Sequence, residues 1–158
     1  SWLLMRSLET LKIRMETAAA NAVKVAEYLS KHPKIEKVYY LGYTKKNNPE
    51  QSEIFGRQYL SNGAMLSFDV VGGEHEAFTF LNNLKHIKLA VSLGGTESLA
   101  EHPASMTHAD VPYDEKQELH ITDKMVRISI GIGNYKDIIW DIEQALEKVK
   151  IPAPEQVL

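Results

Sequence analysis

Arg127 is the residue whose type and setting most clearly offer chemistry. It stands in the alternating stretch Lys-Met-Val-Arg-Ile-Ser-Ile-Gly at residues 124–131. This period of two predicts a strand with Val126, Ile128 and Ile130 on a buried face and Arg127 on the open one. A guanidinium held on a rigid strand can bind a planar carboxylate through two parallel charge-assisted hydrogen bonds. Most strand arginines are instead solvated or sit in weak surface ion pairs, so other features must decide.

Ser92 is a second candidate, because it ends a strand predicted at residues 87–91 and precedes Leu93-Gly94-Gly95. Its hydroxyl and the loop amides can face a ligand, or the hydroxyl can satisfy its own turn. Arg127 and this loop together offer a grip for an anion, but no nucleophile and no acid–base pair. The residue chemistry alone therefore describes part of a site.

Several other kinds of site are excluded or disfavoured. Cysteine is absent, which excludes disulfides, zinc–thiolate sites and thiol nucleophiles. Gly131-x-Gly133 lacks the third glycine and the later acid of a dinucleotide site, so a turn at the strand end is favoured. His102 and His108 do not have metal-ligand spacing, and we interpret them as groups that cap a loop. No metal site and no catalytic residue is expected in this chain.

Length and charge bound the class of protein. The chain has 158 residues, typical of a single domain with its own core, and its net charge is −3. This charge gives no basic surface for nucleic acid or for an anionic membrane. No apolar run reaches membrane-spanning length and no signal peptide is visible. We therefore expect a cytoplasmic protein that binds neither nucleic acid nor membrane.

The elements that must position Arg127 and Ser92 follow from hydrophobic spacing. A stripe of apolar or small residues at every third or fourth position predicts one long helix in residues 1–30, ending at His32-Pro33. Further helices are predicted at residues 49–60, 74–84 and 134–149, with Asn134 as the cap of the last. Strands are predicted at residues 35–41, 64–70, 87–91 and 124–130. The stripe of the first helix consists of Leu8, Leu11, Met15, Ala18, Ala22, Val25 and Leu29.

The order of these elements indicates an α/β fold of the α+β type. Strands with one polar face favour a mostly antiparallel sheet of about four strands with helices packed on one face. Residues 92–121 carry few core signals, and a stretch of this length inside a domain is typical of a functional loop. We expect one domain, 1–158, with a sheet-and-helix body at residues 35–150 and a tail at residues 151–158.

Three ordered motifs resemble a known family. They are Leu-Ala-Val-Ser-Leu-Gly-Gly-Thr-Glu-Ser-Leu at residues 89–99, Glu-His-Pro-Ala-Ser-Met-Thr-His at 101–108, and Met-Val-Arg-Ile-Ser-Ile-Gly at 125–131. They closely resemble the C-terminal domain of the cysteine/methionine-metabolism family of pyridoxal-phosphate enzymes, of fold type I, such as the methionine and cystathionine gamma-lyases. Residues 1–6 look like the family's crossing between domains, so the resemblance covers nearly the whole chain.

The resemblance implies roles for the candidate residues. Arg127 stands where the family's arginine binds the substrate α-carboxylate, and Ser92 stands beside that carboxylate and the cofactor-bearing lysine. The cofactor, pyridoxal 5'-phosphate, belongs to the family's large domain, which we expect to lie outside this chain. None of Lys31, Lys85, Lys88 and Lys124 stands in the motif of the catalytic lysine. The resemblance thus implies an inactive part of an enzyme that is a homotetramer when it is full length.

The loop before Ser92 bears on the substrate. Cystathionine-cleaving relatives usually have glutamate where this chain has Val91, and an apolar Val91 suits the methylthio tail of methionine. We expect Val91 and Leu93 to contact the substrate with Ser92, and we favour methionine gamma-lyase, which releases 2-oxobutanoate, ammonia and methanethiol.

Other activities remain open: cystathionine gamma-lyase or synthase, O-acetylhomoserine sulfhydrylase, or a stand-alone carboxylate-binding or assembly module without enzymatic activity. The chain also departs from the family, because Ser7 and His120 stand where relatives usually have glycine, and Gly133 where they usually have an acid.

Overall fold

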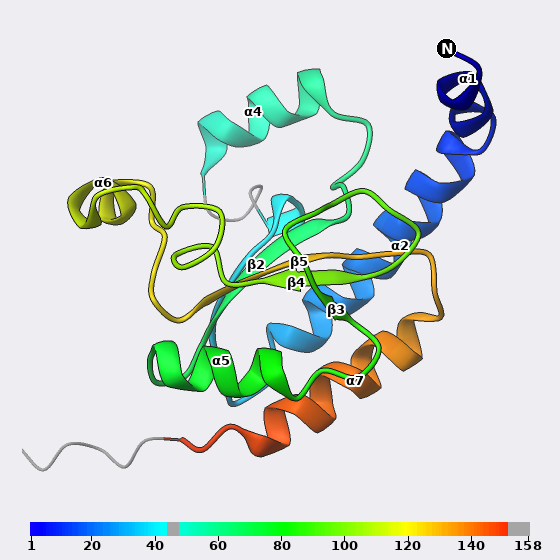
Figure 1. Ribbon diagram of the computed structural model, residues 1–158. Coiled ribbons are helices and arrows are strands. Elements are labelled where there is room, and N and C mark those ends of the chain that lie inside the picture. Colours follow the sequence, from blue (N-terminus) through cyan, green and yellow to red (C-terminus); the bar gives the residue numbers. More distant parts are fainter. Residues whose placement is uncertain (44–47, 152–158) are drawn as a thin grey trace, which may run out of the picture.

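One mixed sheet of five strands organises the molecule, in the order β1-β2-β5-β4-β3 (Figure 1). The computed structural model describes residues 1–43 and 48–151. The expected α/β class is confirmed, with five strands in place of about four. In chain order the elements are α1 (Trp2–Glu9), α2 (Leu11–Leu29), β1 (Ile35–Tyr39), a 3-10 turn η1 (Leu41–Tyr43), α4 (Pro49–Gln58), β2 (Met65–Val70), α5 (Glu74–Asn82), β3 (Lys88–Leu89), β4 (Leu99–Glu101), α6 (Tyr113–Glu118), β5 (Met125–Ser129) and α7 (Tyr135–Lys148).

Strand β5 lies in the middle of the sheet and is antiparallel to both of its neighbours. Arg127 is opposite Ser67 of β2 on one side and Glu101 of β4 on the other. The pairs formed by β1 with β2 and by β2 with β5 are also antiparallel, and only β3 with β4 is parallel. The sheet is therefore mostly antiparallel, as its half-polar strands predict.

The fifth strand, β4, lies inside the stretch that the sequence predicts as a loop. It has three residues, too few to show an alternating pattern, and its pairing with β5 and β3 defines it. Strand β3 is also shorter than predicted, with two residues in place of residues 87–91. Short strands of this kind depend on their neighbours, so local sequence does not reveal them.

The core lies between the sheet and three helices on one of its faces, α2, α5 and α7 (Figure 1). Val126, Ile128 and Ile130 of the arginine strand are buried, as predicted. Phe68 of β2 and Phe80 of α5 meet edge to face, with their ring centroids 5.6 Å apart. Burying the apolar side chains of β5 against helices fixes the register of the strand and so the face that carries Arg127.

The first helix differs from its prediction, because the chain breaks at Thr10 into α1 and α2. The break is held by Arg14, whose Nη2 donates to the Ser7 carbonyl (2.9 Å) and whose Nε donates to the Thr10 hydroxyl (3.2 Å). The predicted stripe is buried only from Ala18 onward, while its earlier part is exposed. The periodicity predicts the apolar face of the helix, but not where the surface that it packs against ends.

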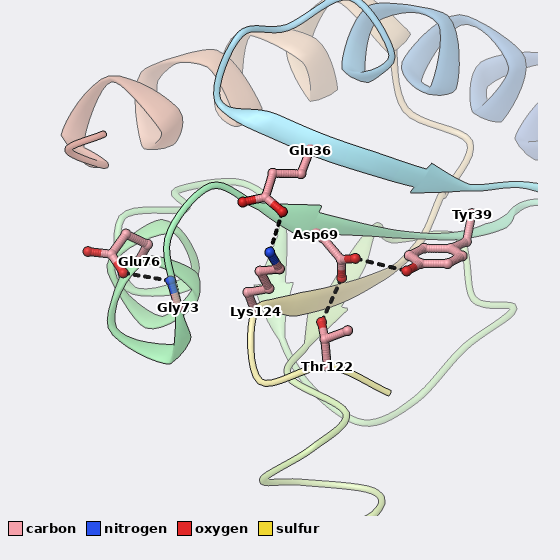
Figure 2. Close-up of polar contacts among 7 residues, drawn as sticks. All are labelled: Glu36, Tyr39, Asp69, Gly73, Glu76, Thr122 and Lys124. Carbon is pink, nitrogen blue, oxygen red and sulfur yellow. Dashed lines mark hydrogen bonds and ion pairs between the residues drawn. The ribbon is translucent and has the colours of Figure 1, made fainter. Parts of the chain in front are cut away.

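The face of the sheet opposite the helices is less open than expected. Ser129 is buried, and its hydroxyl accepts a hydrogen bond from the Gly94 amide (3.0 Å). Asp69 is also buried, because the segment around Thr122 crosses this face (Figure 2). The face expected to be open is therefore partly covered, since the long loop folds back over the strand that carries Arg127.

The two edge strands are short or irregular. Strand β3 forms one edge, and β1 forms the other with a shift of register between Ile35 and Lys37. Glu36 stands at that shift and pairs with Lys124, the residue before β5 (Figure 2).

The last helix matches its prediction. The side chain of Asn134 accepts from the Lys136 amide, Asp137 lies in the first turn, and the predicted apolar stripe is buried. The predicted tail at residues 151–158 lies outside the described residues, except for Ile151. In the described part of the chain, no helix has the length and apolar character needed to cross a membrane.

Candidate functional site

Arg127 emerges from the middle of the sheet beside an acidic side chain. Its Nη1 lies 2.8 Å from Oε1 of Glu101, the residue opposite it on β4. The Arg127 side chain remains 22% exposed, whereas that of Glu101 is only 1% exposed. The acidic partner of this ion pair is therefore buried, and of the two side chains only that of Arg127 is accessible to a ligand.

A cavity of about 410 Å³ lies beside Arg127, between β1, β2 and α4. Arg127 could not bind the carboxylate of a ligand if its charge were neutralised by another residue in a closed site. Glu101 does pair with Arg127, but the cavity gives the guanidinium an open side. The other residues that line the cavity are Lys37, Val38, Tyr39, Tyr40, Leu41, Tyr43, Asn48, Gln51, Met65, Leu66 and Ser67.

Tyr39, which lines this cavity, belongs to a small polar network with Asp69 and Thr122 (Figure 2). The Tyr39 hydroxyl donates to Oδ2 of Asp69 (2.8 Å), and the Thr122 hydroxyl donates to Oδ1 of the same carboxylate (2.7 Å). Burial raises the pKa of Tyr39 above its ordinary value, and the hydrogen bond to Asp69 and that carboxylate's charge raise the pKa further. Tyr39 therefore presents a neutral phenol to the cavity at any physiological pH.

Ser92, Val91 and Leu93 are all exposed, in the loop that follows β3. None of the three lines the cavity beside Arg127 in the described part of the chain. The loop nevertheless reaches the arginine strand, because the Gly94 amide donates to the hydroxyl of Ser129, two residues from Arg127 on the same face. The structure therefore brings the loop of Ser92 to the strand of Arg127, while the side chains face different spaces.

The turn after β5 is clamped from two sides. A Cβ on Gly131 would lie 2.3 Å from the Thr96 carbonyl oxygen, so only glycine fits against the loop at this point. On the other side, the amide of Asn21 in α2 donates to the carbonyls of Gly131 (3.1 Å) and Gly133 (2.7 Å). Gly131-x-Gly133 is thus a turn at a strand end, as interpreted from the sequence.

Two anchoring residues escaped the sequence analysis. Asp141 of α7 is fully buried, and its carboxylate accepts 2.8 Å hydrogen bonds from the amides of Lys85, His86 and Ile87, just before β3. Asn21 and Asp141 each interrupt the apolar stripe of a predicted helix. A polar residue inside such a stripe is the signal that could have identified both as buried hydrogen-bonding residues, although it does not indicate which backbone groups they bind.

His102 supports the loop. Its ring is buried, with Nδ1 2.7 Å from the Ser105 hydroxyl and Nε2 2.7 Å from the Asp123 carbonyl oxygen. Because a carbonyl only accepts, Nε2 carries a proton and donates to Asp123. The interpretation of His102 as a loop cap agrees with this geometry. Within residues 1–43 and 48–151, no cluster of histidine and acidic side chains is suited to a metal ion.

The four lysines considered in the sequence analysis lie away from the cavity beside Arg127. Lys31 pairs with Glu27, Lys124 pairs with Glu36, and the Lys85 ammonium lies 5.4 Å from the centroid of the Trp140 ring. Neither these nor Lys88 lines the cavity beside Arg127. Lys37 does line this cavity, and its ammonium lies 4.5 Å from the centroid of the Tyr39 ring. The cavity therefore holds a lysine in addition to the guanidinium of Arg127, which fits a carboxylate.

Comparisons with known proteins agree with the resemblance seen in the sequence. The family model described as Cys/Met metabolism PLP-dependent enzyme matches residues 1–147. The chain is 49% identical over 149 residues to L-methionine gamma-lyase of Fusobacterium nucleatum subsp. polymorphum. This alignment covers 94% of this chain and 37% of that protein. It is 46% identical over 149 residues to cystathionine gamma-lyase of Bacillus subtilis (strain 168), covering 94% of this chain and 38% of that one.

The fold has the same relatives. A crystal structure of cystathionine gamma-lyase from Lactobacillus plantarum complexed with L-serine superposes with a TM-score of 0.85 at 38% identity, covering 94% of this chain and 38% of that chain. A putative O-acetylhomoserine (thiol)-lyase from Campylobacter jejuni superposes with a TM-score of 0.83 at 35% identity, covering 92% of this chain and 34% of that chain. The chain thus spans less than two-fifths of the length of these relatives.

Proposed function

The chain belongs to the Cys/Met-metabolism family of pyridoxal-phosphate-dependent enzymes, and from that premise we propose that it is the substrate-carboxylate-binding part of a carbon–sulfur lyase. The observation that carries the proposal is Arg127, a central-strand arginine that is partly exposed and lines a cavity. The preferred reaction converts methionine to 2-oxobutanoate, ammonia and methanethiol. Its remaining machinery belongs to a large domain outside this chain, in an enzyme that we propose to be a homotetramer.

Arg127 acts in this proposal by binding and orienting. Its free N–H groups donate to the substrate α-carboxylate, which a planar guanidinium matches in geometry. The charge of Arg127 does not change during the reaction, so its contribution is to hold the amino acid in the reactive orientation. When bound, pyridoxal phosphate supplies the electron sink for cleavage. We propose that the residues that hold this cofactor lie in the large domain, and that this chain's own part is to bind the substrate.

The loop that carries Ser92 gives the second contribution. Val91, Ser92 and Leu93 are exposed, and the Gly94–Ser129 hydrogen bond holds the loop beside β5. Ser92 does not line the cavity beside Arg127, so in the proposed enzyme its hydroxyl approaches the substrate carboxylate from the side of the loop. Val91 and Leu93 offer apolar surface to the methylthio tail, which an acidic residue at position 91 would not do.

A test of the carboxylate role uses the full-length enzyme. Arg127→Ala removes charge-assisted hydrogen bonds worth about 1.5–3 kcal/mol, which lowers kcat/KM for methionine roughly 10- to 150-fold. Lys124→Ala is the matched control, because Lys124 is also a cation at β5 but pairs with Glu36 and does not line the cavity. If Arg127→Ala binds the cofactor yet keeps the wild-type kcat/KM, the assignment is wrong.

Cystathionine gamma-lyase is the second candidate, favoured by the relative from Bacillus subtilis. Comparing kcat/KM for methionine and cystathionine in the same enzyme, and again in Val91→Glu, separates the two. The methionine assignment predicts that the substitution shifts preference toward cystathionine, because a carboxylate disfavours an apolar tail and attracts a second amino group. A wild-type preference for cystathionine would decide for the second candidate.

A further inference from the structure

We propose that Glu101 is a positioning residue for Arg127, and that it holds Nη1 so that the other guanidinium N–H groups face the cavity. The inference rests on the proposed function of Arg127 as a carboxylate-binding group. Glu101 itself is too deeply buried to touch a substrate. It acts through the orientation of the arginine.

The sheet places the two side chains side by side. Glu101 and Arg127 are directly opposite in the antiparallel pairing of β4 with β5, so their side chains leave the sheet on the same face. The distance of 2.8 Å between Oε1 and Nη1 leaves no room for a water molecule between them. The Thr107 hydroxyl donates to the same Oε1 (3.2 Å) and so steadies the carboxylate.

The other buried acids show that Glu101 is an exception. Both oxygens of Asp69 accept hydrogen bonds, and so do both oxygens of Asp141. Oε2 of Glu101 is buried and has no hydrogen-bond partner among the described residues. Keeping a carboxylate in this state costs free energy, because a buried charge needs all its hydrogen bonds to offset desolvation.

The free-energy cost of this unsatisfied oxygen indicates that Glu101 has a role other than stabilising the sheet. An acid that served only to stabilise the sheet would have both oxygens satisfied, as Asp69 and Asp141 do. Glu101 instead directs its contacts through Oε1, which is the oxygen that meets Arg127. The negative charge of Glu101 also weakens the attraction of Arg127 for anions in general. Glu101 thus lowers the affinity of Arg127 for a carboxylate but fixes the orientation of its guanidinium.

The first test is nuclear magnetic resonance of this chain, with arginine side chains labelled, to measure rotation of the Arg127 guanidinium about its Nε–Cζ bond. Glu101→Gln removes the charge but keeps the shape, and we expect rotation to become several-fold faster. Glu36→Gln is the matched control, since it breaks the ion pair with Lys124 and leaves Arg127 alone. Unchanged rotation in a folded Glu101→Gln protein would overturn the proposal.

A second variant covers the case in which Glu101→Gln does not fold. Thr107→Val removes the hydroxyl that steadies Oε1 while leaving the carboxylate in place. We expect a smaller but measurable acceleration of Arg127 rotation in this variant. If Thr107→Val folds and the Arg127 guanidinium rotates as slowly as in the wild type, that result is sufficient to overturn the proposal.

Kinetics of the full-length enzyme separate this inference from the function on which it rests. Glu101→Gln should lower kcat per bound cofactor roughly tenfold through misorientation, while KM for methionine stays the same or falls. Arg127→Ala should lower kcat/KM in any case. If Arg127→Ala has no effect, the carboxylate function is wrong. If only Glu101→Gln has no effect, that function stands and the positioning role of Glu101 is wrong.

Discussion

Gly131→Ala is the substitution whose effect the structure defines most sharply. The new Cβ would lie 2.3 Å from the Thr96 carbonyl oxygen, 2.6 Å from the Glu97 carbonyl carbon and 2.8 Å from the Ser98 nitrogen. All three are backbone atoms, which cannot swing aside as the end of a side chain can. Either the loop or the end of β5 must move.

The magnitude follows from what that movement breaks. Overpacking costs about 1–3 kcal/mol. The displaced loop also weakens two hydrogen bonds, from the Gly131 amide to the Ser98 hydroxyl (3.0 Å) and from the Ile132 amide to the Thr96 carbonyl (3.0 Å). Each contributes about 1 kcal/mol when intact, so losing about half of each adds about 1 kcal/mol. We therefore expect Gly131→Ala to lower the free energy of unfolding by about 2–4 kcal/mol.

The assay is urea denaturation of the chain, with the m-value compared between variants so that a change in midpoint reports stability. Gly133→Ala is the matched control, because a Cβ there meets nothing within 4 Å. It should change the free energy of unfolding by less than about 1 kcal/mol. The packing argument is refuted if Gly131→Ala is as stable as Gly133→Ala.

Two further predictions concern the edge of the site and a strained turn. As pH rises above about 10, the ordinary pKa of tyrosine, stability should fall, because Tyr39 stays protonated in the folded state while the unfolded chain ionises. Urea midpoints at pH 8 and pH 10.5 test this sign, and Tyr39→Phe should reduce the slope; equal slopes would contradict it. His120 has a φ of 56°, in the left-handed region that glycine adopts freely, so His120→Gly should raise the free energy of unfolding by up to about 1 kcal/mol. A loss of stability on thermal unfolding would show that the His120 side chain matters more than its backbone.

The sequence predicted the arginine strand and the last helix because each carries a complete pattern. Val126, Ile128 and Ile130 alternate over a full strand, and the stripe of α7 is framed by the Asn134 cap. The three-residue strand β4 has no such pattern. Glu101 belongs to this strand and is opposite Arg127. Because the strand could not be predicted from the sequence, the ion pair between Glu101 and Arg127 could not be predicted either.

Long-range contacts explain most of the other differences. Nothing local indicates that Asn21 will bind carbonyls beyond residue 130, or that Gly94 will bind Ser129. The exposure of Ser92, Val91 and Leu93 outside the cavity of Arg127 likewise depends on how the loop returns to the sheet. The break at Thr10 depends on where the core ends. Each is set by the packing of distant segments, which a periodic pattern does not encode.

The two edges of the sheet bear on how the protein behaves at high concentration. A foreign strand needs a long, regular row of free amides and carbonyls on which to align. Strand β3 offers two residues, and β1 is interrupted between Ile35 and Lys37, where a charged side chain stands. Within the described residues, neither edge of the sheet therefore offers the long, regular strand that edge-to-edge aggregation between copies of this chain requires.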